Sequence, residues 1–171
     1  MQPIHAPFPM TRFRRTRRTA ALRALTQEVT LSAGDLIWPL FLRDGIGQRE
    51  PIASMPGVER LSVDLVVEAA KTAQDLGIPA ICLFPYTDPA KKTADCREAW
   101  NPDNLANRAI RAIKAAVPDI AVMTDVALDP YNAHGHDGLV VDGVILNDET
   151  VEALVKMALA QAASGADILG P

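Results

Sequence analysis

The chain has 171 residues, of which 49% are hydrophobic, and a formal net charge of −4 at pH 7. With a mean hydropathy of +0.07, this composition predicts one ordinary soluble domain. No apolar run approaches the roughly 20 residues that a membrane-spanning helix needs. The two cysteines, Cys82 and Cys96, have the spacing of neither a disulfide framework nor a zinc ribbon, which favours a reducing, cytoplasmic setting.

Positive charge is concentrated at the start of the chain. Residues 1–18 contain five arginines and no acidic residue, so subtracting their charge of +5 from the net −4 leaves −9 for the remainder. Arginine-rich, acid-poor starts are typical of transit peptides and of arms that bind nucleic acid. Only Phe13 interleaves the arginines and no secretory apolar core is present, so we favour neither. We treat residues 1–18 as a separate basic arm, with a solvated tail as the alternative.

The rest of the chain alternates between helical and extended patterns. We expect a short helix over 19–29, strands over 36–42, 80–84, 120–125 and 167–169, and longer helices over 62–77, 104–117 and 147–165. Ser62 is the expected N-cap of the first longer helix, and Asn147 or Asp148 that of the last. An apolar stripe in the last helix is formed by Val151, Leu154, Val155, Ala158, Leu159 and Ala162. Residues 43–60 form a long connection punctuated by glycine and proline, and residues 85–103 form another that contains three prolines.

Apolar strands that alternate with amphipathic helices indicate a parallel sheet covered by helices. Four such strands suit either a small doubly wound sheet or half of a (β/α)8 barrel. The long loops all follow strands, where barrel active sites lie, and no glycine-rich phosphate-binding fingerprint follows the first strand. We therefore expect an α/β fold of the TIM-barrel type, with residues 19–171 forming the first half of the barrel.

The most polar stretch, residues 123–138 (MTDVALDPYNAHGHDG), follows the third expected strand. A strand end would hold Asp125 at a fixed place in a barrel mouth, while Pro130 and two glycines allow the loop to fold back over it. A carboxylate there could hold a substrate ammonium or transfer a proton. The alternative is an aspartate that caps the next turn.

The same loop carries further candidate ligands. Two carboxylates, Asp129 and Asp137, could converge on a hard cation such as Mg²⁺ or Ca²⁺, and they suit zinc less well. His134 and His136 point to opposite sides of an extended loop, so only one should reach the pocket. We favour His136, beside Asp137, with Tyr131 as a weaker candidate. A hydrogen bond that orders the loop is the alternative role for both.

Residues 125–131 and 134–138, read in order, resemble the metal-site loop of the porphobilinogen synthase family, also called 5-aminolevulinate dehydratase. Other segments resemble this family in the same order, namely 35–41, 54–58, 83–85, 100–103, 108–111 and 165–167. The resemblance runs from about residue 11 to the last residue. Family members are considerably longer, and the chain resembles only their first half.

The resemblance implies a TIM barrel, an active-site aspartate at Asp125 and a lyase reaction that condenses two 5-aminolevulinate molecules to porphobilinogen in haem biosynthesis. It also implies a homo-octamer in which the basic arm wraps a neighbouring subunit. In zinc-using members, three cysteines occupy the places of Ala127, Asp129 and Asp137. This sequence therefore resembles the branch that uses magnesium or needs no metal at this site, and zinc is not expected.

The family works through lysines that form Schiff bases with the substrate keto groups, and these lysines belong to strands beyond residue 171. The lysines present here fall on expected helices, at positions 71, 114 and 156, or in a loop, at 91 and 92. We therefore expect the first half of a porphobilinogen synthase that is inactive alone. The alternatives are a non-catalytic relative that binds a partner through the arginine-rich arm, and a compact Mg²⁺-dependent enzyme that uses Asp125, Asp129 and Asp137.

Overall fold

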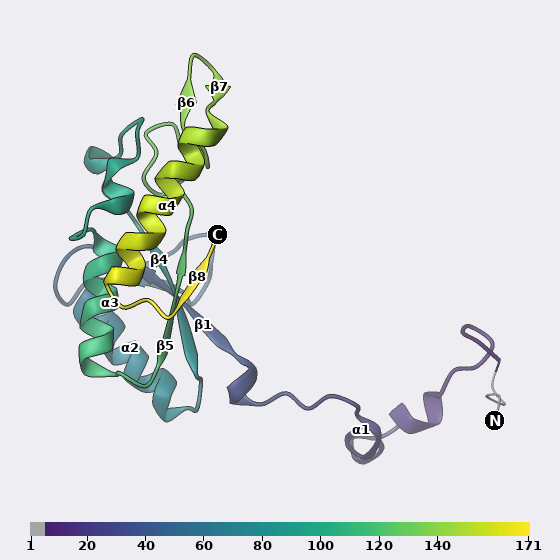
Figure 1. Cartoon of the computed structure of the whole chain (residues 1–171). Helices are drawn as coiled ribbons and strands as arrows, with labels where there is room; N and C mark the ends of the chain where they lie inside the picture. The colour runs from purple at the N-terminus through teal and green to yellow at the C-terminus, as the bar shows by residue number, and fades with distance from the viewer. Residues whose placement is uncertain (1–5) are drawn as a thin grey trace. The chain divides into compact units, whose positions relative to one another are not determined.

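The computed structural model describes residues 6–171, which fall into two units, the first ending at Ser32 and the second formed by Ala33–Pro171 (Figure 1). The predicted boundary after residue 18 lies inside the first unit, and residues 1–5 of the predicted arm lie outside the described residues. The first unit contains α1 (Ala20–Thr26), which is shorter than the expected 19–29. The Thr19 hydroxyl caps α1 by accepting a hydrogen bond from the Leu22 amide at 3.2 Å, and no α1 side chain is buried.

The second unit is built on a six-stranded sheet of order β2-β3-β1-β4-β5-β8. Four consecutive strands of this sheet are parallel and confirm the four predicted strands. They are β1 (Ile37–Leu42), β4 (Ala80–Pro85), β5 (Ala121–Asp125) and β8 (Ile168–Gly170). The connection expected over 43–60 is more ordered than predicted. It contains the antiparallel strands β2 (Arg49–Pro51) and β3 (Glu59–Leu61). β3 adds a parallel neighbour to the carboxyl end of β1.

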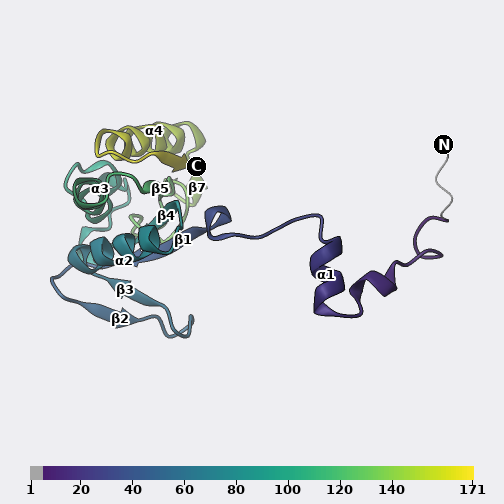
Figure 2. The ribbon, with the colours of Figure 1, turned by 90° about the horizontal axis from the view of Figure 1, so that it is seen from below.

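Three helices, α2 (Val63–Asp75), α3 (Leu105–Ala116) and α4 (Asn147–Ala163), lie on one side of this sheet (Figure 2). The main core joins α2 and α3 to alternate residues of three strands, which include Leu40, Leu42, Ile81, Leu83 and Val122. A doubly wound sheet carries helices on both faces. Covering one face only leaves the other face as the inner wall of a barrel, as predicted.

The helix starts depend on different local contacts. Ser62 is the N-cap residue of α2, as predicted, although its hydroxyl accepts from the Gln48 amide instead of capping the helix. The predicted cap of α4 is wrong, since Leu146 is the N-cap and Asn147 is the first helical residue. A hairpin that the sequence analysis missed, β6 (Val140–Val141) and β7 (Val144–Ile145), sets this start. Asp142 and Gly143 in its turn both have positive φ, as a two-residue hairpin of type I′ requires.

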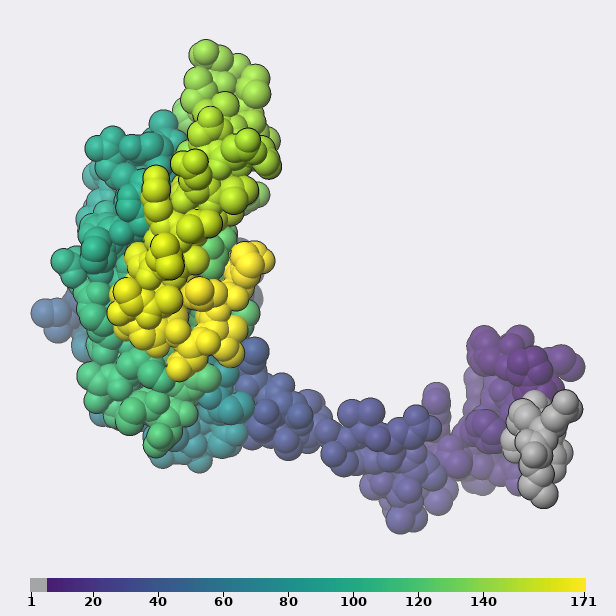
Figure 3. Space-filling model, in the orientation of Figure 1, coloured from purple at the N-terminus to yellow at the C-terminus, as the bar shows by residue number. Residues whose placement is uncertain are grey.

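The predicted apolar stripe of α4 is only partly correct. The buried face consists of Ala153, Met157 and Gln161, whereas Val155 and Leu159 are 52% and 65% exposed. Apolar residues surround α4, so helical spacing alone could not select the buried side. Figure 3 shows this helix along the surface of the second unit. Even so, none of the helices in residues 6–171 combines the length and apolarity needed to cross a membrane.

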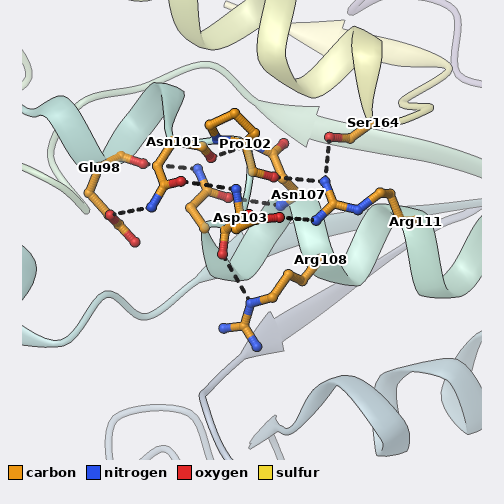
Figure 4. A network of polar contacts seen from close by, with 9 residues as sticks. Glu98, Asn101, Pro102, Asp103, Asn107, Arg108, Arg111 and Ser164 are labelled. Carbon is orange, nitrogen blue, oxygen red and sulfur yellow. Dashed lines mark hydrogen bonds and ion pairs between the residues drawn. The ribbon is translucent and has the colours of Figure 1, made fainter.

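A polar network holds the loop between β4 and α3 in place (Figure 4). The Arg111 guanidinium, on α3, donates to the Pro102 carbonyl at 2.7 Å and to the Asp103 carboxylate at 2.8 Å. It also donates to the Ser164 hydroxyl, just after α4, at 3.3 Å. Asn107, fully buried, donates to the Asn101 carbonyl. The loop is therefore tied by hydrogen bonds to α3 and to the end of α4.

Candidate active site

The open face of the sheet carries one row of side chains at the carboxyl ends of the strands. Phe41 pairs with Arg60 on one side and with Phe84 on the other. Because Leu83 pairs with Thr124, the next residues, Phe84 and Asp125, are also neighbours. Side chains in register on adjacent strands project from the same face. The row across four strands is therefore Arg60, Phe41, Phe84 and Asp125.

These four residues line a cleft of about 240 Å³. The other side chains around it come from the loops after β4 and β5 and from α4, and they include Tyr86, Ala127, Asp129, Tyr131 and Met157. The Phe41 and Phe84 rings stack with their centroids 5.5 Å apart. A largely apolar cleft with a few charged groups is typical of a small-molecule site. Its place at the carboxyl ends of parallel strands is that of a barrel active site.

Hydrogen bonds to the backbone at the end of β5 hold Asp125 in place. The Gln161 amide group, on α4, donates to the Asp125 carbonyl at 3.0 Å and accepts from the Thr124 hydroxyl at 2.9 Å. Both Gln161 and Thr124 are 1% exposed. The next amide, that of Val126, donates to the Gly170 carbonyl of β8 at 3.0 Å. The end of β5 is thereby fixed from one helix and one neighbouring strand.

The carboxylates of this region affect one another. Burial raises the pKa of the Asp125 carboxyl above its usual value, and repulsion from Asp129 and Asp137 raises it further. Burial and the charge of Asp137 likewise raise the pKa of Asp129, while Lys92 opposes this shift. The three predicted carboxylates are therefore close enough to interact. Asp125 and Asp129 line the cleft, whereas Asp137 is not among its lining residues.

The other two predicted loop residues have different surroundings. Tyr131 borders the cleft but is only 1% exposed, and burial raises the pKa of its hydroxyl. Its ring packs in a second core cluster with Leu128 and Met157. The Nδ1 atom of His136 accepts a hydrogen bond from the Gly138 amide at 3.0 Å, and this residue does not line the cleft. The contacts of His136 are those of a residue that orders the loop.

The side chains of the loop after β5 offer few donor atoms for a metal ion. Zinc takes three or four nitrogen, sulfur or carboxylate ligands from the protein, and no group of three histidine, cysteine or acidic side chains within residues 6–171 is arranged to hold a metal. Ala127 lines the cleft without a donor atom in its side chain. Magnesium retains several waters and is often held by one or two carboxylates. Asp129 and Asp137 fit that requirement chemically.

Among the described residues, none of the cleft-lining side chains is a lysine. Lys71, Lys91 and Lys114 form ion pairs with Glu68, Asp44 and Asp167. The Lys114 Nζ also donates to the Pro118 and Ile120 carbonyls. Both cysteines are buried and free, and burial raises the pKa of Cys96 to about 11. The cleft thus contains acids and one guanidinium but no amine or thiol nucleophile.

Three of the four residues in the row across the strands were missed by the sequence analysis. Arg60 lay in a predicted connection, and Phe41 and Phe84 read as strand core. Their joint position depends on strand register, which periodicity does not reveal because a shift of one residue reverses the face. The Pro56-Gly57 pair before β3, with Gly57 at φ +82°, was the one available signal that the chain turns back to the sheet there.

Comparisons with known proteins agree on one family. The family model described as delta-aminolevulinic acid dehydratase matches residues 10–171. The dehydratase of Rhodobacter capsulatus is 60% identical over 100% of this chain and 52% of its own length, and that of Bradyrhizobium diazoefficiens is 57% identical over 92% and 45%.

A solved structure of the enzyme from Toxoplasma gondii, in complex with the reaction product porphobilinogen, superposes with a TM-score of 0.86 at 44% identity. It covers 93% of this chain and 46% of that one. The predicted barrel fold is thereby confirmed, and the chain spans about half the length of the relatives it matches. The chain belongs to the delta-aminolevulinic acid dehydratase family.

Proposed function

We propose that this chain supplies the first strands and the Asp125 carboxylate of a porphobilinogen synthase, a lyase that condenses two 5-aminolevulinate molecules in haem biosynthesis. The observation that carries the proposal is the position of Asp125, fixed by Gln161 at the carboxyl end of β5 and facing the cleft. The Toxoplasma gondii relative binds porphobilinogen, the product of this reaction.

The chemistry assigned to Asp125 follows from its surroundings. A carboxyl whose pKa is raised by burial and by two neighbouring acids exchanges its proton more readily near neutral pH. In its ionised form it attracts the substrate ammonium, and in its protonated form it donates to a leaving oxygen. Asp129, which also lines the cleft, strengthens the preference for a cationic group.

Schiff-base formation needs a deprotonated lysine, which requires lowering a pKa of about 10.4 by roughly three units, or about 4 kcal/mol. None of the five lysines lines the cleft. Three form ion pairs, Lys92 lies in a loop, and Lys156 of α4 lies over the Trp100 ring. We therefore propose that the nucleophilic lysines come from residues outside this sequence. The 171 residues alone should show no turnover.

A magnesium ion, if used, would be held by Asp129 and Asp137 with waters completing its coordination. When bound there, it would supply positive charge beside the cleft. We further propose a cytoplasmic homo-oligomer, in keeping with the exposed apolar residues Val155 and Leu159 of α4. Light scattering of the purified protein tests the assembly state.

The test of function is porphobilinogen formation. The chain alone should produce none, whereas co-expression with the second half of the Rhodobacter capsulatus relative, which is 60% identical over this region, should restore product. Steady product from the isolated chain would contradict the assignment of the lysines. No product from the combined halves, despite a stable complex on gel filtration, would contradict the proposed function.

A further inference from the structure

The chain contains three Asp-Gly pairs, at residues 44–45, 137–138 and 142–143. In such a pair the backbone nitrogen of the glycine can attack the aspartate carboxyl, because glycine lacks the Cβ that would hinder the approach. The attack forms a bond from nitrogen to Cγ, and the carboxyl hydroxyl leaves as water together with the amide proton. Water then opens the resulting cyclic imide at either carbonyl carbon. The product is aspartate or isoaspartate, and nothing is oxidised or reduced.

Contacts within the fold protect two of the three pairs. The Asp44 carboxylate forms ion pairs with Arg108 and Lys91, and the hydrogen bond from Arg108 lowers the pKa of this carboxyl. An ionised carboxylate has no hydroxyl that can leave as water. The Gly138 amide donates to the Nδ1 atom of His136 at 3.0 Å, and Gly138 is buried. The reacting carboxyl is therefore occupied in one pair, and the attacking nitrogen is occupied in the other.

The third pair, Asp142-Gly143, lacks both kinds of protection. It forms the exposed turn of the β6–β7 hairpin (Figure 1). Within residues 6–171, neither the Asp142 carboxylate nor the Gly143 amide takes part in a hydrogen bond or an ion pair. The hairpin strands have two residues each, and Val141, Val144 and Ile145 are all more than half exposed. A two-stranded hairpin is marginally stable by itself, so this turn opens locally and samples the conformations that the attack requires.

We propose that Asp142-Gly143 is a site of spontaneous covalent modification, at which the folded chain forms a cyclic imide and then isoaspartate while the other two pairs stay intact. A type I′ turn favours Asp-Gly, because both central residues need positive φ. The hairpin therefore requires the same pair that is chemically reactive. Isoaspartate routes the backbone through Cβ and lengthens a two-residue turn by one carbon. The Val141–Val144 pair can then no longer be closed by the same turn.

Incubation of the folded 171-residue chain at neutral pH in ¹⁸O-enriched water tests this proposal, because each opening of the imide adds one labelled oxygen. Proteolysis and mass spectrometry assign the label to the three pairs, and electron-transfer fragmentation distinguishes isoaspartate from aspartate. Residues 142–143 should acquire label at least about fivefold faster than either other pair, which is the factor that one lost hydrogen bond corresponds to. In concentrated urea, where all three pairs are unprotected, the three rates should become similar.

Three variants test the chemistry and its selectivity. Asp142→Glu keeps the charge but would have to close a larger ring, so it should abolish label and isomerisation at this turn. Arg108→Gln removes an ion pair of Asp44 and should speed labelling of residues 44–45. Arg97→Gln is the matched control, because it removes an ion pair with Asp95, and it should leave residues 44–45 unchanged.

Equal labelling of the three pairs in the folded chain overturns the proposal. Label at position 142 that persists in Asp142→Glu overturns it as well, since the imide could not then be its source. Isoaspartate that forms at residues 142–143 in urea but not in the folded chain would show that the hairpin protects this pair. If Arg108→Gln leaves labelling of residues 44–45 unchanged, the ion pair is not the reason for the selectivity.

Discussion

The two faces of one sheet differ in what determines their residues. The face toward α2 and α3 is packed with aliphatic side chains such as Leu42, Leu83 and Val122, all at most 1% exposed. The opposite face carries Arg60, two aromatic rings and Asp125 around a cleft. Both faces come from the same alternating strands. One side of each strand therefore determines stability, and the other is available for chemistry.

The largest expected loss of stability comes from a substitution in the face covered by α2 and α3. Leu83→Ala should destabilise the second unit by about 2–5 kcal/mol, because it removes a fully packed side chain and leaves a cavity. Ile37→Ala, in the same sheet but 49% exposed, should cost less than about 1 kcal/mol. Urea denaturation of both variants measures the difference. Equal losses would contradict the assignment of the two faces.

Loss of the Gln161 hydrogen bonds to the end of β5 should destabilise the fold less than Leu83→Ala does. Gln161→Leu removes the partner of the Thr124 hydroxyl and of the Asp125 carbonyl. Each buried group left without a hydrogen bond costs about 1–3 kcal/mol. Gln74→Leu, at an exposed position on α2, is the control and should be nearly neutral. If the two variants melt at the same temperature, Gln161 does not hold the end of β5.

The contribution of Asp125 to folding stability should change with pH in the opposite direction from that of an ion-paired acid. The folded pKa of Asp125 is raised by burial and by Asp129 and Asp137, so its stability contribution falls as pH rises through that pKa. Asp125→Asn should therefore melt above the unaltered chain at pH 7. The two should converge below about pH 4, near the unfolded pKa.

Asp44 provides the opposite sign. A hydrogen bond from Arg108 lowers its pKa, so the stabilising effect is present at neutral pH and is lost as pH falls through the folded pKa. Asp44→Asn should melt below the unaltered chain at pH 7, and the difference should vanish in acid. Thermal melts of both variants across pH measure the two signs. Shifts of the same sign would show that the cleft does not disfavour the Asp125 charge.

Magnesium should have the smallest effect. If Asp129 and Asp137 hold the ion, millimolar Mg²⁺ should raise the melting temperature by a few degrees, through preferential binding to the folded state. Asp129→Ala should remove this rise. Asp148→Ala, on α4 outside the loop, is the control and should retain it. A rise that persists in Asp129→Ala would place the ion elsewhere.

The sequence predicted the covered face well, because burial there follows simple periods. Val66, Ala70 and Ala73 repeat at helical spacing and pack on strands that were predicted within one residue. Prediction from the sequence failed where polar and apolar positions are not clearly separated. Strands of three residues, such as Arg49–Pro51 with its charges and proline, give no alternating signal, and apolar residues on all sides of α4 concealed its buried side.

The candidate site was predictable only in part. The order of residues after β5 indicated Asp125, Asp129 and Asp137, and the structure brings them within electrostatic reach. Arg60 could not be found in this way, since its place in the cleft depends on pairing with a strand 19 positions earlier. Gln161 was equally hidden, because a buried amide on an apolar helix face looks like an exposed one in sequence.

The central claim is that the carboxyl end of β5, and not its amino end, does the chemistry. The most direct test measures porphobilinogen formation by this chain combined with the second half of the Rhodobacter capsulatus relative, comparing Asp125→Asn with Asp119→Asn in the exposed turn before β5. We expect Asp125→Asn to lower the rate by about 100-fold or more and Asp119→Asn to leave it unchanged. Equal rates for the two variants would contradict it.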